Sequence, residues 1–402
     1  MKNICKRAAA GLLALMMCLG FAGCYSENNT WAARKGDITL PIGGYIYYLY
    51  SAYSDAASQV DTETAVLDSQ IEGEDASQWI RDEALNYLQA YYYINDKFTE
   101  YGLEWTDEDQ TQAESLSDSY WSYYKSVMEP MGIAQSSFEQ VYGEYTIKMQ
   151  KVLQAAYGEG GELALADGEL KQYFEDNYYS YEYFYAPLTT TNEDGESETM
   201  SEEDQNALEE ELQKYVDRIN DEEVTVSEAA DEYAADAETD STYYKPTATK
   251  ADNLTSELAS ALESVDEGET TIAQTSNALY VIRRLSIADA YTDEIEASED
   301  QQLSLLSDMK GQEFYDYVMK QAAAVEGIEI NQSAINNVKI SKLVNDSNRN
   351  GTSSESSSSE SSDTEDTSST AEESSESSAE ESSSEVSSEV SSEASSESSV
   401  AE

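Results

Sequence analysis

The sequence predicts an α+β protein in which helical segments lie on both sides of a unit built on an antiparallel sheet. Three observations predict this class. Apolar residues recur at helical spacing through positions 41–174. The pattern over 178–285 then reads strand, helix, short helix, helix, strand, strand, which favours an antiparallel sheet. The helical pattern returns at 303–324, before mixed structure at 327–344.

The first half is predicted to consist of helices, the first of which begins near Pro41. Pro41 suits the first turn of a helix. Ser136 and Glu139 form a capping-box pattern, and Asp167 is placed to cap a further helix. We expect apolar stripes at steps of three and four to face the core. Two such stripes are Ile80, Ala84, Tyr87, Tyr91, Ile94 and Phe98, and Leu116, Tyr120, Tyr123 and Val127.

The sheet unit begins with an aromatic-rich strand at 181–188, followed by a polar loop at 189–199. Helices are predicted at 208–219 and 225–233, the second capped by Thr225 and Glu228. Segment 240–253 contains Pro246 and is expected to be irregular. A helix at 254–262 and strands at 272–275 and 279–285 complete the unit.

Composition excludes several classes of site. The chain of 402 residues carries a net charge of −60, which argues against binding nucleic acid and is compatible with a cationic, unfolded client. It contains no histidine, so neither a Ser-His-Asp triad nor a His-containing zinc site is available. A calcium-binding loop motif is also missing from the sequence. We therefore expect no cofactor and no metal.

Tyrosine is unusually common, with 31 tyrosines against 6 phenylalanines. Tyrosine combines a large apolar body with a polar tip. One interpretation is that these residues fill half-exposed helix faces of an acidic, exported protein. The other is that they form a surface that grips extended peptides.

The N-terminus has the pattern of an export signal. Lys2, Lys6 and Arg7 precede a short apolar run at 8–19, and small residues then lead to Cys24. This resembles a bacterial lipoprotein signal, in which residues 1–23 are removed and Cys24 is lipidated as the first mature residue. Phe21 replaces the usual aliphatic residue of that motif. An ordinary secretory signal or an uncleaved anchor is the alternative, and every version places the chain outside the cytoplasm.

Cys24 is also the only one of the 3 cysteines that lies outside the predicted signal peptide, so no disulfide framework is expected. Acylation there would hold the chain to the membrane. Residues 24–30 are then a polar tether. At the other end, residues 346–402 are rich in Ser and Glu, lack aromatic residues and are predicted to be disordered.

The order of elements resembles the extracytoplasmic foldases of the SurA and PrsA type. Three segments carry the resemblance: GELKQYFEDN at 168–177, LESVDEGE at 262–269 and YVIRRL at 280–285. The resemblance implies a helical chaperone domain built from 31–174 and 289–345. A parvulin-type peptidyl-prolyl isomerase domain would be inserted at 175–288. It also implies a lipid-anchored protein on the outer face of the membrane, in a Gram-positive bacterium.

The resemblance fails at the catalytic residues. Parvulins use two buried histidines, whose positions fall near Tyr183 and Tyr280 in this chain. A phenol both donates and accepts hydrogen bonds, but two phenols do not reproduce an imidazole network. The hypothesis is therefore a degenerate parvulin domain that binds peptides without turning them over, with Tyr183 and Tyr280 as candidate residues.

Three functions follow from this sequence. The first is a lipid-anchored chaperone that binds unfolded exported polypeptides, as a monomer or a homodimer. The second is a peptidyl-prolyl isomerase with a histidine-free site around Tyr183 and Tyr280. The third is a solute-binding lipoprotein, which would usually have two α/β lobes, whereas the first third of this chain is predicted to be helical.

Overall fold

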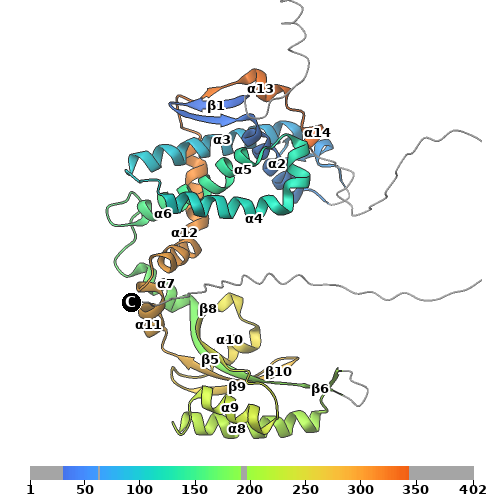
Figure 1. The fold of residues 1–402 in the computed structure, drawn as a ribbon, viewed down its shortest axis with the longest axis vertical. Coiled ribbons are helices and arrows are strands. Elements are labelled where there is room, and N and C mark those ends of the chain that lie inside the picture. Colours follow the sequence, from blue (N-terminus) through green and yellow to red (C-terminus); the bar gives the residue numbers. More distant parts are fainter. Residues whose placement is uncertain (1–29, 62–63, 192–196, 344–402) are drawn as a thin grey trace, which may run out of the picture. The chain divides into compact units, whose positions relative to one another are not determined.

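The computed structural model describes residues 30–61, 64–191 and 197–343 (Figure 1). Cys24, the predicted signal peptide and the predicted C-terminal tail lie outside the described residues. Within them the fold is α+β, as predicted: helices dominate and the sheets are small and antiparallel. No helix in the described ranges combines the length and the apolar character needed to cross a bilayer.

A three-stranded sheet joins the two ends of the described chain. Its order is β11–β1–β2, formed by β1 (Trp31–Lys35), β2 (Ile38–Pro41) and β11 (Glu329–Ile330). Ala33 pairs with Ile330 in an antiparallel register. The sequence predicts helices from Pro41 onward and misses β1 and β2, because four- and five-residue strands show too little alternation to be recognised from sequence.

Most of the remaining elements in the first half are helices. The long ones are α2 (Ile42–Ser58), α3 (Ala76–Glu100), α4 (Asp107–Met131) and α6 (Tyr145–Tyr157). The short elements are η1 (Val66–Asp68), β3 (Gln70–Ile71), β4 (Glu74–Asp75) and α5 (Gln135–Phe138). A π-helix, η2 (Glu139–Glu144), connects α5 to α6. After the sheet unit, α12 (Glu299–Ala322), α13 (Gln332–Asn337) and α14 (Ile340–Leu343) follow.

Two predicted caps are wrong. The Ser136–Glu139 capping box does not form, because α5 begins at Gln135 and Ala134 occupies the cap position. Gly168, at a φ of +77°, precedes α7 (Glu169–Asn177), so Asp167 is not its cap. A left-handed residue is needed there, and glycine adopts that conformation without a steric penalty.

The sheet unit has four antiparallel strands in the order β8–β5–β10–β9. The strands are β5 (Tyr178–Pro187), β8 (Tyr244–Lys250), β9 (Thr270–Gln274) and β10 (Ala278–Leu285). Helices α8 (Glu202–Asn220) and α9 (Val226–Asp236) cover one face (Figure 1). Helix α10 (Ser256–Glu263) packs on the other, where Leu262 contacts the cluster of Tyr181 and Ile282.

Two segments of this unit differ from prediction. Segment 240–253 is not irregular, since it contains β8 and the turn η3 (Ala251–Asn253). β8 is an edge strand, which explains why none of its residues is fully buried and why it tolerates Pro246. The predicted loop at 189–199 contains a small hairpin of β6 (Thr189–Thr191) and β7 (Ser197–Thr199). The helical turns α11 (Ile287–Ala290) and η4 (Tyr291–Glu296) then lead to α12.

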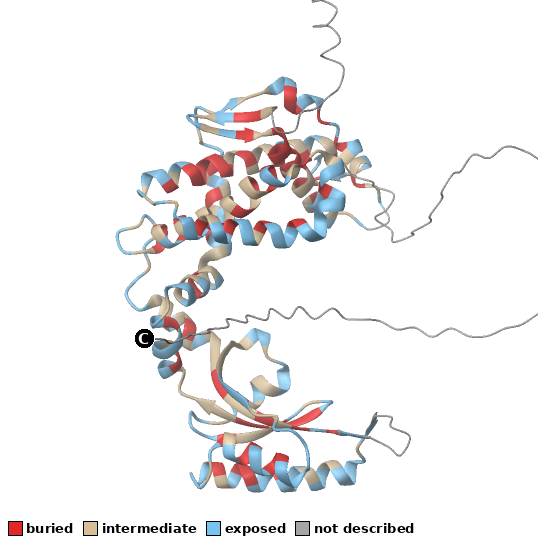
Figure 2. Cartoon of the chain, in the orientation of Figure 1, coloured by how far each residue is buried: buried red, intermediate tan, exposed pale blue. Residues whose placement is uncertain are grey.

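The largest core lies among the first helices and the three-stranded sheet. Ile80, Ala84 and Leu88 of α3 pack there against Tyr45 and Leu49 of α2, and all five are buried. Figure 2 shows more buried residues along α3 than along α4, which is largely exposed. The exposed side of α4 is part of the site described next.

Candidate functional site

The structure brings the two predicted site residues together. Tyr183 on β5 pairs with Ile282, and Tyr280 on β10 pairs with Tyr185. Both side chains lie on the face of the sheet that α10 packs against. Their ring centroids are 5.4 Å apart, with the rings at 62° to each other.

Further tyrosines surround this pair. Side chains two residues apart on a strand point to the same face, so Tyr181, Tyr183 and Tyr185 lie in a row along β5. Tyr183 stacks on Tyr244 of the edge strand, with centroids 5.0 Å apart and rings 5° from parallel. We call Tyr181, Tyr183, Tyr185, Tyr244 and Tyr280 the tyrosine face.

The tyrosine face can bind by stacking and hydrogen bonding. Burial, with a smaller effect of the neighbouring phenols, raises the pKa of Tyr183 to about 12. Burial also raises the pKa of Tyr280. Both phenols are therefore protonated at neutral pH and cannot serve as general bases there. This chemistry suits peptide binding better than proton transfer.

A second site, which sequence reasoning missed, is a pair of adjoining cavities in the helical part. Glycines allow the helices that line these cavities to pack closely. A Cβ added at Gly143 of η2 would lie 2.4 Å from the carbonyl oxygen of Ala113 in α4. One added at Gly44 of α2 would lie 2.7 Å from Val141 of η2. Helices α2 and α4 therefore pack directly against the π-helix.

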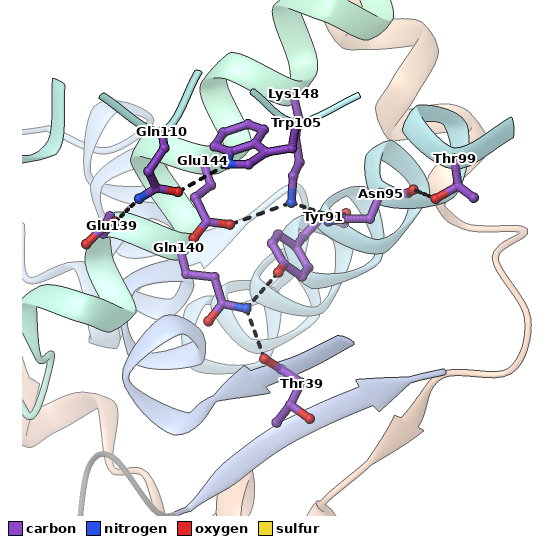
Figure 3. Close-up of polar contacts among 10 residues, drawn as sticks. All are labelled: Thr39, Tyr91, Asn95, Thr99, Trp105, Gln110, Glu139, Gln140, Glu144 and Lys148. Carbon is purple, nitrogen blue, oxygen red and sulfur yellow. Dashed lines mark hydrogen bonds and ion pairs between the residues drawn. The ribbon is translucent and has the colours of Figure 1, made fainter. Parts of the chain in front are cut away.

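Polar side chains fasten the π-helix to its surroundings (Figure 3). The Gln140 side-chain amide donates to the carbonyl oxygen of Thr39 at 2.9 Å and to the Tyr91 hydroxyl at 2.7 Å. The Gln110 amide of α4 donates to Glu139 at 3.0 Å. These bonds hold η2 to β2, α3 and α4, and so fix the position of Tyr142. Single π-helical turns occur frequently at functional sites.

The inner cavity has a volume of about 230 Å³. Its walls come from α2, α3, η2, α6 and α12, and six of its eleven lining residues are tyrosines. They are Tyr47, Tyr48, Ser51, Tyr87, Ala90, Val141, Tyr142, Tyr145, Thr146, Tyr315 and Met319.

The outer groove adjoins it and has a volume of about 370 Å³. Tyr47, Ser51 and Tyr142 line both hollows, which therefore share a wall. The other lining residues of the outer groove are Tyr50, Ser54, Asp55, Tyr120, Tyr124, Met128 and Phe138.

The outer groove opens beside an exposed aromatic stripe on α4. The exposed fractions are 46% for Tyr120, 82% for Tyr123, 46% for Tyr124 and 41% for Val127. Tyr120 also lies 4.9 Å from Tyr142 between ring centroids, which connects the stripe to the groove. The expectation that Tyr120, Tyr123 and Val127 face the core is wrong.

The buried side of α4 is formed instead by small and bulky residues at helical spacing. They are Ala113, Ser117, Trp121 and Met128. Sequence periodicity alone does not separate the two stripes, because tyrosine satisfies an apolar pattern even when its ring is exposed. The surplus of tyrosine over phenylalanine is the sequence signal that pointed to an aromatic surface.

Carboxylates lie close to the cavity walls. The Tyr87 hydroxyl donates a hydrogen bond of 2.5 Å to Asp55, a residue of the outer groove. Burial raises the pKa of Tyr87, and the bond to Asp55 and the charge of Glu83 raise it further. The site thus combines aromatic rings with negative charge.

Comparison with known proteins gives matches among solved structures only, since no family model and no curated protein matches. The foldase protein PrsA from Lactococcus lactis is 14% identical, over 79% of this chain and 100% of that chain, with a TM-score of 0.36. PrsA from Streptococcus pneumoniae is 13% identical, over 74% of this chain and 94% of that chain, with a TM-score of 0.33. PrsA from Bacillus subtilis is 13% identical, over 68% of this chain and 93% of that chain, with a TM-score of 0.26.

Proposed function

We propose that this chain is an extracytoplasmic chaperone that binds unfolded, exported polypeptides in the tyrosine-lined cavities of its helical part. The observation that carries the proposal is the exposed aromatic stripe of α4 beside the outer groove. Contiguous exposed apolar surface of this kind marks an interaction site. Tyrosine is enriched at interfaces because its ring contributes contact area and its hydroxyl remains able to hydrogen-bond.

The charge of the protein supports a preference for basic clients. With a net charge of −60, long-range attraction would bring cationic unfolded segments to the surface and repel acidic ones. Tyrosine rings contact many different side chains without strict geometry, which suits a protein that must bind many sequences. The binding free energy is therefore expected to be spread over many weak contacts.

Membrane attachment is part of the proposal and rests on the sequence. A lipid on Cys24, after removal of residues 1–23, would hold the chaperone on the outer face of the membrane, in a Gram-positive bacterium. Exported chains emerge at that surface in an unfolded state. In a living cell, replacing Cys24 with Ala should release the protein from the membrane fraction.

Aggregation of a reduced, basic model substrate tests the chaperone proposal. Stoichiometric amounts of the full-length chain should delay the rise in light scattering. An acidic protein without a tyrosine groove, at the same net charge, serves as the control. If the chain leaves the aggregation rate unchanged, the proposed function is wrong.

A second candidate function is peptidyl-prolyl isomerisation at the tyrosine face. One observation favours it, namely the adjacency of Tyr183 and Tyr280 on neighbouring strands. Isomerisation is a rotation over a barrier of about 18–20 kcal/mol and needs no covalent step. We propose binding without turnover, because neither phenol reproduces the imidazole network of a parvulin.

A further inference from the structure

The sheet unit ends in an edge strand, β9, whose outer backbone groups are only partly occupied. In an antiparallel pair, every second residue turns its N–H and C=O groups away from the partner strand. Thr275 donates its backbone N–H to the carbonyl oxygen of Ala278 at 3.0 Å, so the odd-numbered residues of β9 bond to β10. Thr270, Ile272 and Gln274 therefore turn their backbone groups toward the open edge.

One of these three residues is already capped. The Asn220 side chain at the end of α8 accepts a hydrogen bond of 2.8 Å from the Thr270 N–H and donates one of 3.0 Å to the Thr270 carbonyl oxygen. A single side-chain amide thus takes the place of a neighbouring strand. The backbone N–H and C=O groups of Ile272 and Gln274 have no such partner among the described residues. Two residues on the same edge are therefore able to bond to a further strand.

A groove lies beside this free part of the edge. It has a volume of about 280 Å³. Helix α8 runs alongside β9, since Asn220 at its C-terminal end bonds to Thr270 while residues of its N-terminal half line the groove. The lining residues are Glu202, Gln205, Asn206, Glu209, Gln274 and Leu279. Extended peptides bind to exposed sheet edges by adding a strand, and this groove gives their side chains room.

The opposite edge of the same sheet, β8, is protected against such pairing. Pro246 lacks an N–H group, Lys245 adds a charge, and the register with β5 shifts between Tyr181 and Tyr183. Proline, lysine and bulges are devices by which natural edge strands avoid pairing. The sequence of β9, TTIAQ, contains neither proline nor lysine, and β9 pairs with β10 in continuous register. One edge of the sheet is therefore blocked and the other is open.

We propose that the β9 edge binds an extended segment of the client polypeptide as an added strand, through the backbone groups of Ile272 and Gln274. The inference rests on the proposed chaperone function and adds to it a second contact, in the sheet unit, that recognises the main chain. Every polypeptide carries the same backbone groups, so this contact does not depend on the client's sequence. A folded protein, whose backbone groups are already paired, does not compete for it.

A client segment fits this edge better than a second copy of the chain. Glu202 and Glu209 place carboxylates in the groove, and no lysine or arginine lines it within the described ranges. Two copies that paired through β9 would bring these carboxylates together, and like charges oppose such pairing. A client segment with neutral or basic side chains meets no repulsion there.

Two labelled peptides test whether the main chain is recognised. Both alternate threonine with valine and carry a lysine at each end, and one of them has N-methyl groups on consecutive central residues. The methyl groups remove the backbone N–H donors of either register and leave the side chains unaltered. Fluorescence anisotropy with the full-length chain gives each Kd. The unmodified peptide should bind about tenfold more tightly than the methylated one, as expected for the loss of about two hydrogen bonds.

A pair of substitutions at Gln274 locates the contact. Gln274→Pro removes the outward N–H group, and proline is tolerated at an edge position whose N–H faces solvent. Gln274→Ala removes the same side chain but keeps that N–H, which makes it the matched control. The two peptides should bind equally to the Gln274→Pro variant, whereas the Gln274→Ala variant should preserve the difference between them.

Amide hydrogen exchange measured by NMR gives a readout that needs no substitution. The unmodified peptide should slow exchange at Ile272 and Gln274, whose N–H groups are otherwise open. Exchange at Thr270 should stay unchanged, because Asn220 already holds that N–H. Slowing at Ile272 and Gln274 without peptide, as the protein concentration rises, would identify a second copy as the occupant and overturn the assignment.

The outcomes separate this inference from the proposed function. Equal Kd values of the unaltered chain for the two peptides, or a difference that survives Gln274→Pro, would overturn the β9 assignment and leave client binding in the helical part standing. Failure of both peptides to bind, while aggregation of a client is still suppressed, has the same meaning. If neither peptide binds and aggregation is also unaffected, both proposals are wrong.

Discussion

Gly143 of the π-helix approaches α4 so closely that a methyl group there would lie 2.4 Å from the carbonyl oxygen of Ala113. The same added Cβ would also lie 2.2 Å from the Ser117 hydroxyl oxygen. Backbone cannot move aside as a flexible side chain can. The close approach therefore fixes the separation of α4 and η2, and with it the position of Tyr142 between the two cavities.

Replacing Gly143 with Ala should consequently destabilise the protein. Overpacking of this kind costs about 1–3 kcal/mol, and a thermal melt followed by circular dichroism would show a lower Tm. Gly311→Ala is the matched control, because Gly311 lies inside α12 and a Cβ there meets nothing within 4 Å. That change should raise stability by up to about 1 kcal/mol. Equal effects of the two substitutions would contradict the close-packing account.

Stability should also depend on the ionisation of Asp308. Partial burial opposes ionisation, but hydrogen bonds from Lys250, Tyr173 and Tyr178 outweigh it and lower the pKa of Asp308. A lowered pKa in the folded state stabilises the protein above the ordinary pKa of about 4, and this contribution disappears as the pH falls through the folded value.

Asp308→Asn should therefore lower the free energy of unfolding by about 1 kcal/mol at pH 7, since the group is partly exposed. In urea titrations the difference between the unaltered chain and the variant should shrink as the pH falls below 4. Asp316→Asn, at an exposed position of the same helix, provides the control. A difference that stays constant from pH 7 to pH 2 would contradict the assigned bonds.

The tyrosine face should bind proline-containing peptides without accelerating their isomerisation. A protease-coupled assay of the full-length chain with a panel of Xaa-Pro peptides should give rates at the uncatalysed background. The double variant Tyr183→Phe, Tyr280→Phe should then change nothing in this assay. Rates well above background that fall in the double variant would instead identify a histidine-free isomerase.

Client binding should weaken with salt. Raising the ionic strength from about 0.1 M to 1 M shortens the Debye length from about 10 Å to 3 Å, so long-range attraction between the acidic chain and a basic client is screened. The Kd for a basic unfolded client should rise about tenfold. A neutral client of similar hydrophobicity should show little change. Equal salt effects on both clients would contradict a role for the surface charge.

The sequence predicted the fold class and most helices, because long elements repeat their apolar pattern often enough to be recognised. The stripe from Ile80 to Phe98 is an example, since most of its residues are buried along α3. Short elements were not recognised from the sequence. One of them is the edge strand β8, whose side chains are exposed or only partly buried. Domain boundaries at residues 174, 288 and 345 remain predictions.

The sequence predicted one part of the candidate site, the tyrosine pair, and did not predict the other, the cavities of the helical part. Tyr183 and Tyr280 were placed by resemblance, and the sheet register brings them together. The cavities of the helical part form where residues of several helices approach one another. One such approach is that of Gly143 in η2 to Ala113 in α4. Such distances are not encoded in local periodicity. The exposure of Tyr123 was missed because tyrosine satisfies an apolar pattern even when its ring is exposed.

The most direct test of the chaperone account compares aggregation suppression by three forms of the full-length chain. In one form Tyr120, Tyr123 and Tyr124 on α4 are all replaced with Ser. In the second, Tyr244 on the tyrosine face, which is 55% exposed, is replaced with Ser. The unaltered chain is the third. Because these side chains are exposed, the Tm should change little in either variant.

The α4 variant should lose most of its ability to delay aggregation of a reduced basic client, whereas the Tyr244→Ser variant should retain that ability. Full suppression by the α4 variant, at a concentration where the unaltered chain is just sufficient, would contradict the assignment of client binding to the helical part.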